Sequence, residues 1–171
     1  MKLFISQNLI KVCSIIFLSL LVSSAHADGG NEGNQNSNMY KARSQSHANE
    51  KLVVKFYNKI FNERADVEET ALRFMREDYI QHNAFVGTGR QSFIDGIGGF
   101  LASIPDTKFE IKRVITDGDL VVLLVHMHVP GDGQPGDAIF EILRVQDGKI
   151  AEHWDVQQSI PAFIPHDNGM F

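Results

Sequence analysis

The feature that most constrains this chain is a change of periodicity at Pro105. Beyond it, apolar and polar residues alternate, which is typical of β-strands because successive side chains of a strand point to opposite faces. Asp117-Gly118 and Asp147-Gly148 are strong signals for tight hairpin turns. We therefore expect two hairpins, joined by a loop at residues 130–137, with strands over residues 109–116, 120–129, 138–145 and 150–157.

Before Pro105 the apolar residues recur at spacings of three and four, which predicts amphipathic helices. A second helix is expected over residues 66–75 with Asp66 as its N-cap, and a third between residues 87 and 106. Residues 79–83 are expected to form a short extended or turn segment. Helices followed by an antiparallel sheet predict an α+β fold. The first helix carries one apolar stripe, made of Leu52, Val53, Phe56, Tyr57, Ile60 and Phe61.

The N-terminus has the pattern of a secretory signal peptide over residues 1–27. Lys2 and Lys11 supply the positive charge, residues 12–22 are the apolar run, and Ala25-His26-Ala27 fits the cleavage site. We expect an exported protein, periplasmic or secreted, with no stable membrane anchor after cleavage. Cleavage also removes Cys13, the only cysteine, so the mature chain can form no disulfide.

The mature chain is predicted to contain one domain. Residues 28–45 are rich in Gly, Asn, Ser and Gln and predict a flexible polar linker. Residues 46–165 form the domain, and residues 166–171 a C-terminal tail. The formal net charge of the whole chain is −5, and losing two lysines with the signal makes it −7. An acidic chain without a basic cluster argues against nucleic acid and anionic membranes as partners.

Three polar side chains in the last hairpin are candidates for chemistry. Glu141 shares a strand face with apolar residues, and Asp155 shares its face with Ala151 and His153. A two-residue Asp-Gly loop would pair Glu141 with Trp154, whereas a three-residue loop would bring Glu141 opposite His153 or Asp155. The sequence leaves this register open.

If the faces coincide, two carboxylates and a histidine meet against apolar walls. Burial and a like-charged neighbour raise a carboxyl pKa, which suits proton transfer near neutral pH. The alternative is a structural arrangement, in which Asp155 and His153 form a satisfied polar pair while Glu141 pairs with Arg144 or Lys149. Both interpretations fit the spacing.

Three other histidines are candidate ligands. His126 and His128 share a strand face and could bind a metal ion, but no third ligand is evident, so we expect no metal. A hydrogen bond from one of these rings to Glu141 fits equally well. His82, beside Asn83, either caps the third helix or lies at the mouth of a pocket.

Three stretches together resemble the SnoaL-like polyketide cyclase family of the nuclear transport factor 2-like superfamily: YIQHN at 79–83, IKRVITDGDLVVLLVHMH at 111–128 and FEILRVQDGKIAEHWDVQQ at 140–158. The resemblance spans roughly residues 50–161. It implies an α+β cone, in which a curved antiparallel sheet wraps around three N-terminal helices and encloses an apolar pocket. Family cyclases close a ring by aldol condensation without metal or organic cofactor, and the resemblance implies that Asp155 is the general acid/base.

The resemblance implies two functional alternatives. The first is a cofactor-independent cyclase, isomerase or dehydratase-like lyase acting next to a carbonyl of a small hydrophobic ligand. Asp155 would move the proton, His153 or Glu141 would tune it, and His126 or His82 would hold the oxyanion. The second is a non-catalytic module that binds a small hydrophobic ligand or dimerises; a homodimer is expected in either case. The candidate pocket walls are Phe85, Phe100, Phe140 and Trp154.

Overall fold

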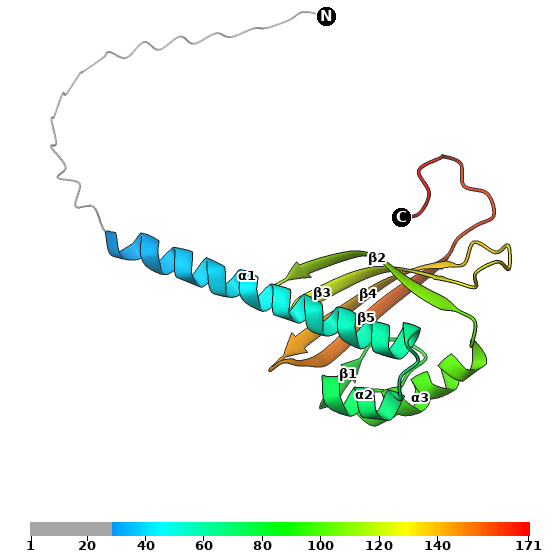
Figure 1. Cartoon of the computed structure of the whole chain (residues 1–171), viewed down its shortest axis with the longest axis horizontal. Coiled ribbons are helices and arrows are strands. Elements are labelled where there is room, and N and C mark those ends of the chain that lie inside the picture. Colours follow the sequence, from blue (N-terminus) through cyan, green and yellow to red (C-terminus); the bar gives the residue numbers. More distant parts are fainter. Residues whose placement is uncertain (1–28) are drawn as a thin grey trace, which may run out of the picture.

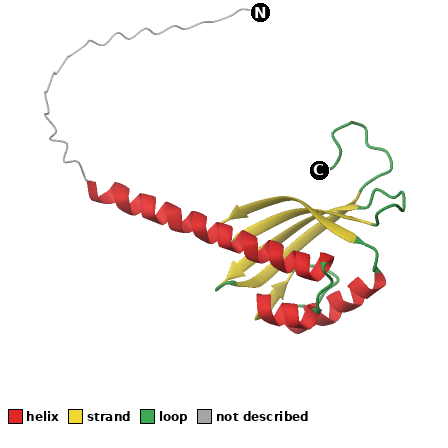
Figure 2. Ribbon diagram, in the orientation of Figure 1, coloured by secondary structure: helices red, strands yellow, loops and turns green. Residues whose placement is uncertain are grey.

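The structure is a computed structural model that describes residues 29–171, and the expected signal peptide lies outside the described residues. None of its helices is long and apolar enough to cross a membrane in the described part. Figure 2 shows the helices in red and the strands in yellow. In chain order the elements are α1 (Gly29–Tyr57), the π-helical turn η1 (Asn58–Asn62), α2 (Val67–Phe74), β1 (Met75–Gln81), α3 (Arg90–Ser103), β2 (Lys108–Asp117), β3 (Leu120–His128), β4 (Asp137–Gln146) and β5 (Lys149–Ser159).

The predicted α+β fold is confirmed: three helices pack on a curved, unclosed sheet of five strands in the order β1-β5-β4-β3-β2. Figure 1 shows α1 crossing the sheet and α2 and α3 near its β1 edge. Both hairpins turn at the predicted Asp-Gly pairs. Asp66 caps α2 as predicted, because its Oδ1 accepts the backbone N–H of Glu69 at 2.7 Å.

The four predicted strands are antiparallel as expected, but the sheet is mixed because β1 joins it as a fifth strand. β1 runs parallel to β5, with Gln81 opposite His153. We expected only a short extended or turn segment at residues 79–83, because MREDYIQ is charged and does not alternate. Its strand conformation comes from pairing with β5 and from the burial of Met75 and Tyr79 against the helices.

The segment expected to be a flexible linker, residues 28–45, is also different in the structure. α1 begins at Gly29, within the expected linker, and its residues 33–45 are exposed. The buried stripe of the same helix, including Val53 and Phe56, packs on the sheet. Once this packed C-terminal half of α1 has formed, adding one more residue to the helix costs far less free energy than starting a new helix. The packed half therefore explains why the exposed N-terminal half is helical although it lacks apolar residues.

The curvature of the sheet comes from bulges, which bend a strand and increase its twist. The β2–β3 register shifts between Ile111 and Arg113, and the β4–β5 register shifts between Arg144 and Val145. The concave face carries the core residues of β3 and β4 and faces α1. Within the described residues no helix covers the other face, which we call the outer face. It exposes Ile115, Phe140 and Val156.

Candidate active site

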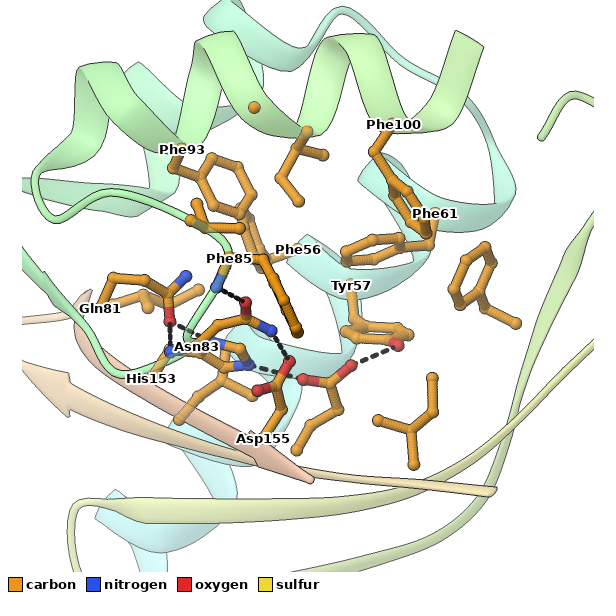
Figure 3. A pocket seen from close by; sticks show the side chains of 18 of the residues that line it. Phe56, Tyr57, Phe61, Gln81, Asn83, Phe85, Phe93, Phe100, His153 and Asp155 are labelled. Carbon is orange, nitrogen blue, oxygen red and sulfur yellow. Dashed lines mark hydrogen bonds and ion pairs between the residues drawn. The ribbon is translucent and has the colours of Figure 1, made fainter. Parts of the chain in front are cut away.

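A cavity of about 340 Å³ lies between the helices and the concave face of the sheet. Figure 3 shows its aromatic side chains on the helical side and its polar side chains together on the sheet side. This volume falls at the lower end of the range for small-molecule pockets. Its aromatic wall consists of Phe56, Tyr57, Phe61, Tyr79, Phe85, Phe93, Phe100 and Phe109, and its polar side of Gln81, Asn83, Glu141, His153, Asp155 and Gln157.

The hairpin register that the sequence left open is set by a tight turn followed by a bulge. Asp147 and Gly148 both have positive φ angles, 52° and 70°, so the loop has two residues. The register then shifts by one residue at Ala151, and Glu141 lies opposite Asp155 instead of Trp154. The bulge therefore brings Glu141 and Asp155 to the same face, where both line the cavity.

Glu141 is only 7% exposed and makes two hydrogen bonds with its two oxygens. Tyr57 Oη donates to Oε1 at 2.9 Å, and His153 Nε2 lies 2.6 Å from Oε2. The proposed pairing of Glu141 with Arg144 or Lys149 was wrong, because both bases lie elsewhere. Arg144 Nε donates to Glu152 on the outer face at 2.7 Å, and Lys149 Nζ donates to a backbone carbonyl of α2.

The protonation of the His153 ring follows from its partners. Nδ1 lies 2.8 Å from Gln81 Oε1. That amide oxygen also accepts the backbone N–H groups of His82 and Asn83, so it can only accept, and Nδ1 must carry a hydrogen. The 2.6 Å contact between Nε2 and Glu141 then requires one more proton, held by one partner or the other. His153 and Glu141 are therefore a proton-sharing pair without net charge.

Asp155 is held differently. Asn83 Nδ2 donates to Asp155 Oδ2 at 2.6 Å, and Asn83 is itself oriented by the backbone N–H of Phe85. Within residues 29–171 this is the hydrogen bond that the Asp155 side chain receives, so Oδ1 keeps its lone pairs. The proposed polar pair of Asp155 with His153 was wrong, since His153 bonds to Glu141 and Gln81.

Two buried tyrosines face these carboxylates. Burial, and next the charge of Glu141, raise the pKa of Tyr57 well above its ordinary value. Burial also raises the pKa of Tyr79, with a smaller contribution from the charges of Glu141 and Asp155. Both phenols are therefore hydrogen-bond donors over the physiological pH range.

The structure separates the residues that we predicted for this site. Glu141, His153 and Asp155 converge, and Phe85 and Phe100 line the cavity. Phe85 is 95% exposed, which places it at the opening. Phe140, Trp154, His82 and His126 were assigned to the pocket wrongly. Phe140 and Trp154 alternate with inward-facing residues and so lie on the outer face, where His82 stacks on Trp154 at 4.7 Å and His126 points as well.

Five polar residues of the site were missed: Tyr57, Tyr79, Gln81, Asn83 and Gln157. Tyr57 had been assigned to an apolar stripe, although its buried hydroxyl needs a partner. Tyr79, Gln81 and Asn83 belong to YIQHN, which we noted for its resemblance, but only His82 was selected from it. The sequence carried no usable signal for them, because Tyr79 and Gln81 share one face only once β1 is known to be a strand.

Glu141, His153 and Asp155 could in principle hold a metal ion, since each offers a ligand atom within 4.8 Å of the others. Their hydrogen bonds do not favour this. Both nitrogens of His153 and both oxygens of Glu141 already have protein partners. A metal ion would have to displace the proton that this pair shares.

The cone of helices and curved sheet, with a polar cluster inside an apolar cavity, defines a nuclear transport factor 2-like fold with a small-molecule pocket. The sequence profile described as SnoaL-like polyketide cyclase matches residues 51–163, and the chain belongs to this family. A search of curated proteins finds no match.

Solved structures with the same fold are distant in sequence. A proposed polyketide cyclase from Bacillus cereus ATCC 10987 is 21% identical, with a TM-score of 0.52 over 62% of this chain and 71% of that one. A proposed isomerase of the SnoaL-like family from Agrobacterium tumefaciens C58 is 15% identical, with a TM-score of 0.54 over 68% and 99%. AclR, a proposed hydroxylase from Streptomyces galilaeus, is 20% identical, with a TM-score of 0.55 over 68% and 82%. These similarities support the fold.

Proposed function

We propose that this protein is a cofactor-independent enzyme that moves a proton next to a carbonyl group of a small hydrophobic compound. The reaction would be an aldol-type cyclisation, an isomerisation or a dehydratase-like elimination. One observation carries the proposal: in an apolar cavity, Asp155 keeps a carboxylate oxygen without a partner among the described residues, while Glu141 and His153 are fully engaged. Asp155 is therefore the base available to a ligand.

In the proposed reaction, Asp155 Oδ1 takes a proton from the carbon next to the carbonyl. The electron pair of the broken C–H bond moves into the carbonyl, whose oxygen becomes an enolate. The enolate carbon then attacks a second carbonyl of the same molecule, or regains a proton at another position, or the enolate expels a hydroxyl group from the neighbouring carbon. Asp155 returns the proton that it took to the new alkoxide, to the carbon or to the departing hydroxyl, which leaves as water, so the step needs no external oxidant, reductant or co-reactant.

The enolate oxygen needs a donor, and Tyr79 is the residue best suited. Tyr79 Oη accepts a hydrogen bond from Gln81 Nε2 at 3.0 Å and has no acceptor for its own proton among the described residues. Its raised pKa keeps that proton in place. A preorganised donor in a cavity shielded from water stabilises developing negative charge more than the same donor in water. Tyr79 replaces His82 and His126, which lie outside the cavity.

The pair of His153 and Glu141 would act as a positioning element. Because the pair is neutral overall, Asp155 carries the unbalanced negative charge of the cluster. If His153 were absent, an ionised Glu141 would repel the carboxylate of Asp155. Tyr57 and Gln81 hold the two ends of the pair, which fixes its distance from Asp155.

The proposal can be tested without knowing the natural substrate. A panel of aromatic and alicyclic ketones and diketones is incubated with the protein in D₂O, and loss of the protons next to the carbonyl is followed by NMR. We expect accelerated exchange for ligands that bind. Gly96 lines the cavity, and a Cβ there would lie 3.6 Å from Val86 Cγ1, so Gly96→Leu should fill the cavity and stop exchange.

Gly99→Leu is the matched control, because it lies on the same helix and a Cβ there meets nothing within 4 Å. It should leave exchange unchanged. Binding of panel members without exchange under any condition would contradict the enzyme and favour the non-catalytic binder. Equal exchange in Gly96→Leu and the unmodified protein would show that the cavity is not the site.

We also propose that the protein is exported and forms a homodimer. Export rests on the signal-peptide pattern, and N-terminal sequencing of the protein purified from its natural host should begin at Asp28. Dimerisation rests on the outer face, where Ile115, Phe140 and Val156 are exposed together on a sheet without a covering helix among the described residues. Sedimentation should show a dimer that Phe140→Glu dissociates.

A further inference from the structure

A second cluster of ligand-type residues lies on the outer face, far from any role in the cavity. Glu110 on β2 is directly opposite His126 on β3, and His128 follows two residues later on the same face. Each offers a ligand atom within 4.8 Å of the others. From the sequence we set aside a metal ion at the two histidines because a third ligand was not evident. The register of the β2–β3 hairpin supplies that ligand as Glu110.

The tautomer of His126 is set for metal binding. Its Nε2 lies 2.8 Å from the carbonyl oxygen of Pro135. A carbonyl oxygen can only accept, so Nε2 carries the hydrogen and Nδ1 keeps its lone pair. Histidines that bind metals are held in this way, with the second ring nitrogen donating to a backbone carbonyl or a carboxylate.

His128 has a buried nitrogen without a hydrogen bond. Its Nε2 is shielded from solvent and has no hydrogen-bond partner in the described part of the chain. Glu110 Oε1 is 3.2 Å away, but the two atoms are not aligned for a hydrogen bond. A buried polar atom without a partner requires an explanation, and a missing ion is one of the usual ones. A cation between Nε2 and the carboxylate would satisfy both.

The surroundings hold this cluster in place. At Gly136, in the loop that carries Pro135, a Cβ would come within 2.2 Å of Met127 O and 2.8 Å of His128 Cβ. The loop is therefore pressed against β3, which fixes the Pro135 carbonyl. On the other side, the ring of Phe171 lies 4.8 Å from that of His126. The cluster is thus bounded on two sides and preorganised.

Lys108 and Lys112 are nearby groups that oppose a cation, and Lys108 lies directly opposite His128 on the neighbouring strand. Lys112 Nζ contacts Glu110 Oε2 at 2.5 Å, so it occupies the carboxylate oxygen other than the one next to His128. This contact orients the carboxylate and leaves Oε1 for His128 and a metal ion. The lysine charge repels a second cation, and we therefore expect affinity in the micromolar range rather than that of a buried structural site.

We propose that Glu110, His126 and His128 bind one divalent transition-metal ion on the outer face, and that zinc is the ion this set accepts. Two imidazole nitrogens and one carboxylate oxygen are a ligand set that suits zinc, with metal–ligand distances of about 2.0–2.2 Å. Small side-chain rotations would bring the three atoms together around an ion. The fourth position would be left to water. The cavity cluster lacks these signs, since its histidine nitrogens both have partners.

The test uses tag-free protein freed of metals with a chelator and titrated with zinc chloride by calorimetry. We expect one zinc ion per chain and a higher melting temperature with zinc than without. Magnesium chloride should produce neither effect, because magnesium prefers oxygen ligands. Each of the variants Glu110→Gln, His126→Gln and His128→Gln should weaken zinc binding at least about tenfold. Circular dichroism and thermal unfolding of the metal-free variants confirm that they fold.

Two controls make the result specific. His166→Gln removes an exposed histidine of the C-terminal tail, and it should bind zinc as the unmodified protein does. His153→Gln removes the histidine of the cavity cluster and should also keep zinc binding. Loss of binding in His153→Gln, or undiminished binding in His128→Gln, would overturn the proposal, as would the absence of any zinc binding to the unmodified chain.

Discussion

Replacing Tyr57 with phenylalanine removes a single oxygen from the base of the cavity. Its hydroxyl donates to Glu141 Oε1 at 2.9 Å, and the two side chains are only 2% and 7% exposed, so water has little access to replace it. A hydrogen bond to a charged or proton-sharing carboxylate contributes about 1.5–3 kcal/mol, and leaving its buried partner unsatisfied costs a similar amount. We expect Tyr57→Phe to lower the free energy of unfolding by about 2 kcal/mol.

For a domain of this size the loss corresponds to a melting temperature lower by about 4–8 °C. Thermal unfolding followed by far-UV circular dichroism at pH 7 measures it. Tyr40→Phe is the matched control, because Tyr40 is 69% exposed, and its melting temperature should not change. A double-mutant cycle with Glu141→Gln isolates the energy of the contact. Unchanged stability of Tyr57→Phe, or a cycle without coupling, would refute the buried hydrogen bond on which the orientation of Glu141 depends.

Two further predictions concern stability. Because the native pKa values of Tyr57 and Tyr79 lie above the unfolded value near 10, both residues favour the native state below pH 10, and this contribution is lost as the pH rises further. A Tyr40→Phe variant leaves Tyr57 and Tyr79 as its tyrosines. Its absorbance at 295 nm, which reports tyrosine ionisation, should therefore rise with pH only when the protein unfolds. A rise while the protein is still folded would contradict the burial of Tyr57 and Tyr79. Gly136→Ala should destabilise the fold by roughly 1–3 kcal/mol, because φ is 79° and a Cβ would lie 2.2 Å from a backbone oxygen of β3. Gly131 has a φ of 85° and open space around it, so Gly131→Ala should lower the free energy of unfolding, measured by chemical denaturation, by less than Gly136→Ala does. Equal losses in the two variants would count against the close approach of Gly136 to β3.

Much of the sheet could be predicted from the sequence because its signals are local. The two Asp-Gly turns fix the hairpins. The alternation of apolar and polar residues on both sides of each turn locates four strands to within about two residues of their observed ends. β1 could not be predicted in the same way, because its charged residues obscure alternation. Its conformation depends on pairing with β5, which is distant in sequence. The exposed half of α1 likewise depends on the packed half.

The candidate site was partly predictable. The inward direction of Glu141 followed from its apolar neighbours on β4, and Asp155 followed from the family resemblance. Their position opposite each other depends on the bulge at Ala151, which has no sequence signal of its own. The errors at Phe140 and Trp154 were avoidable, because each is adjacent to an inward-facing carboxylate and alternation sends it to the outer face.

The most direct test of the proposed chemistry compares ligand binding with proton exchange in Asp155→Asn. For a panel compound that the unmodified protein exchanges, we expect the dissociation constant to stay within about threefold while the exchange rate falls at least about 100-fold, since general base catalysis contributes factors of that size. Glu152→Gln is the control, because it removes a carboxylate of the outer face and should change neither quantity. Exchange that survives in Asp155→Asn would contradict the assignment of Asp155 as the base.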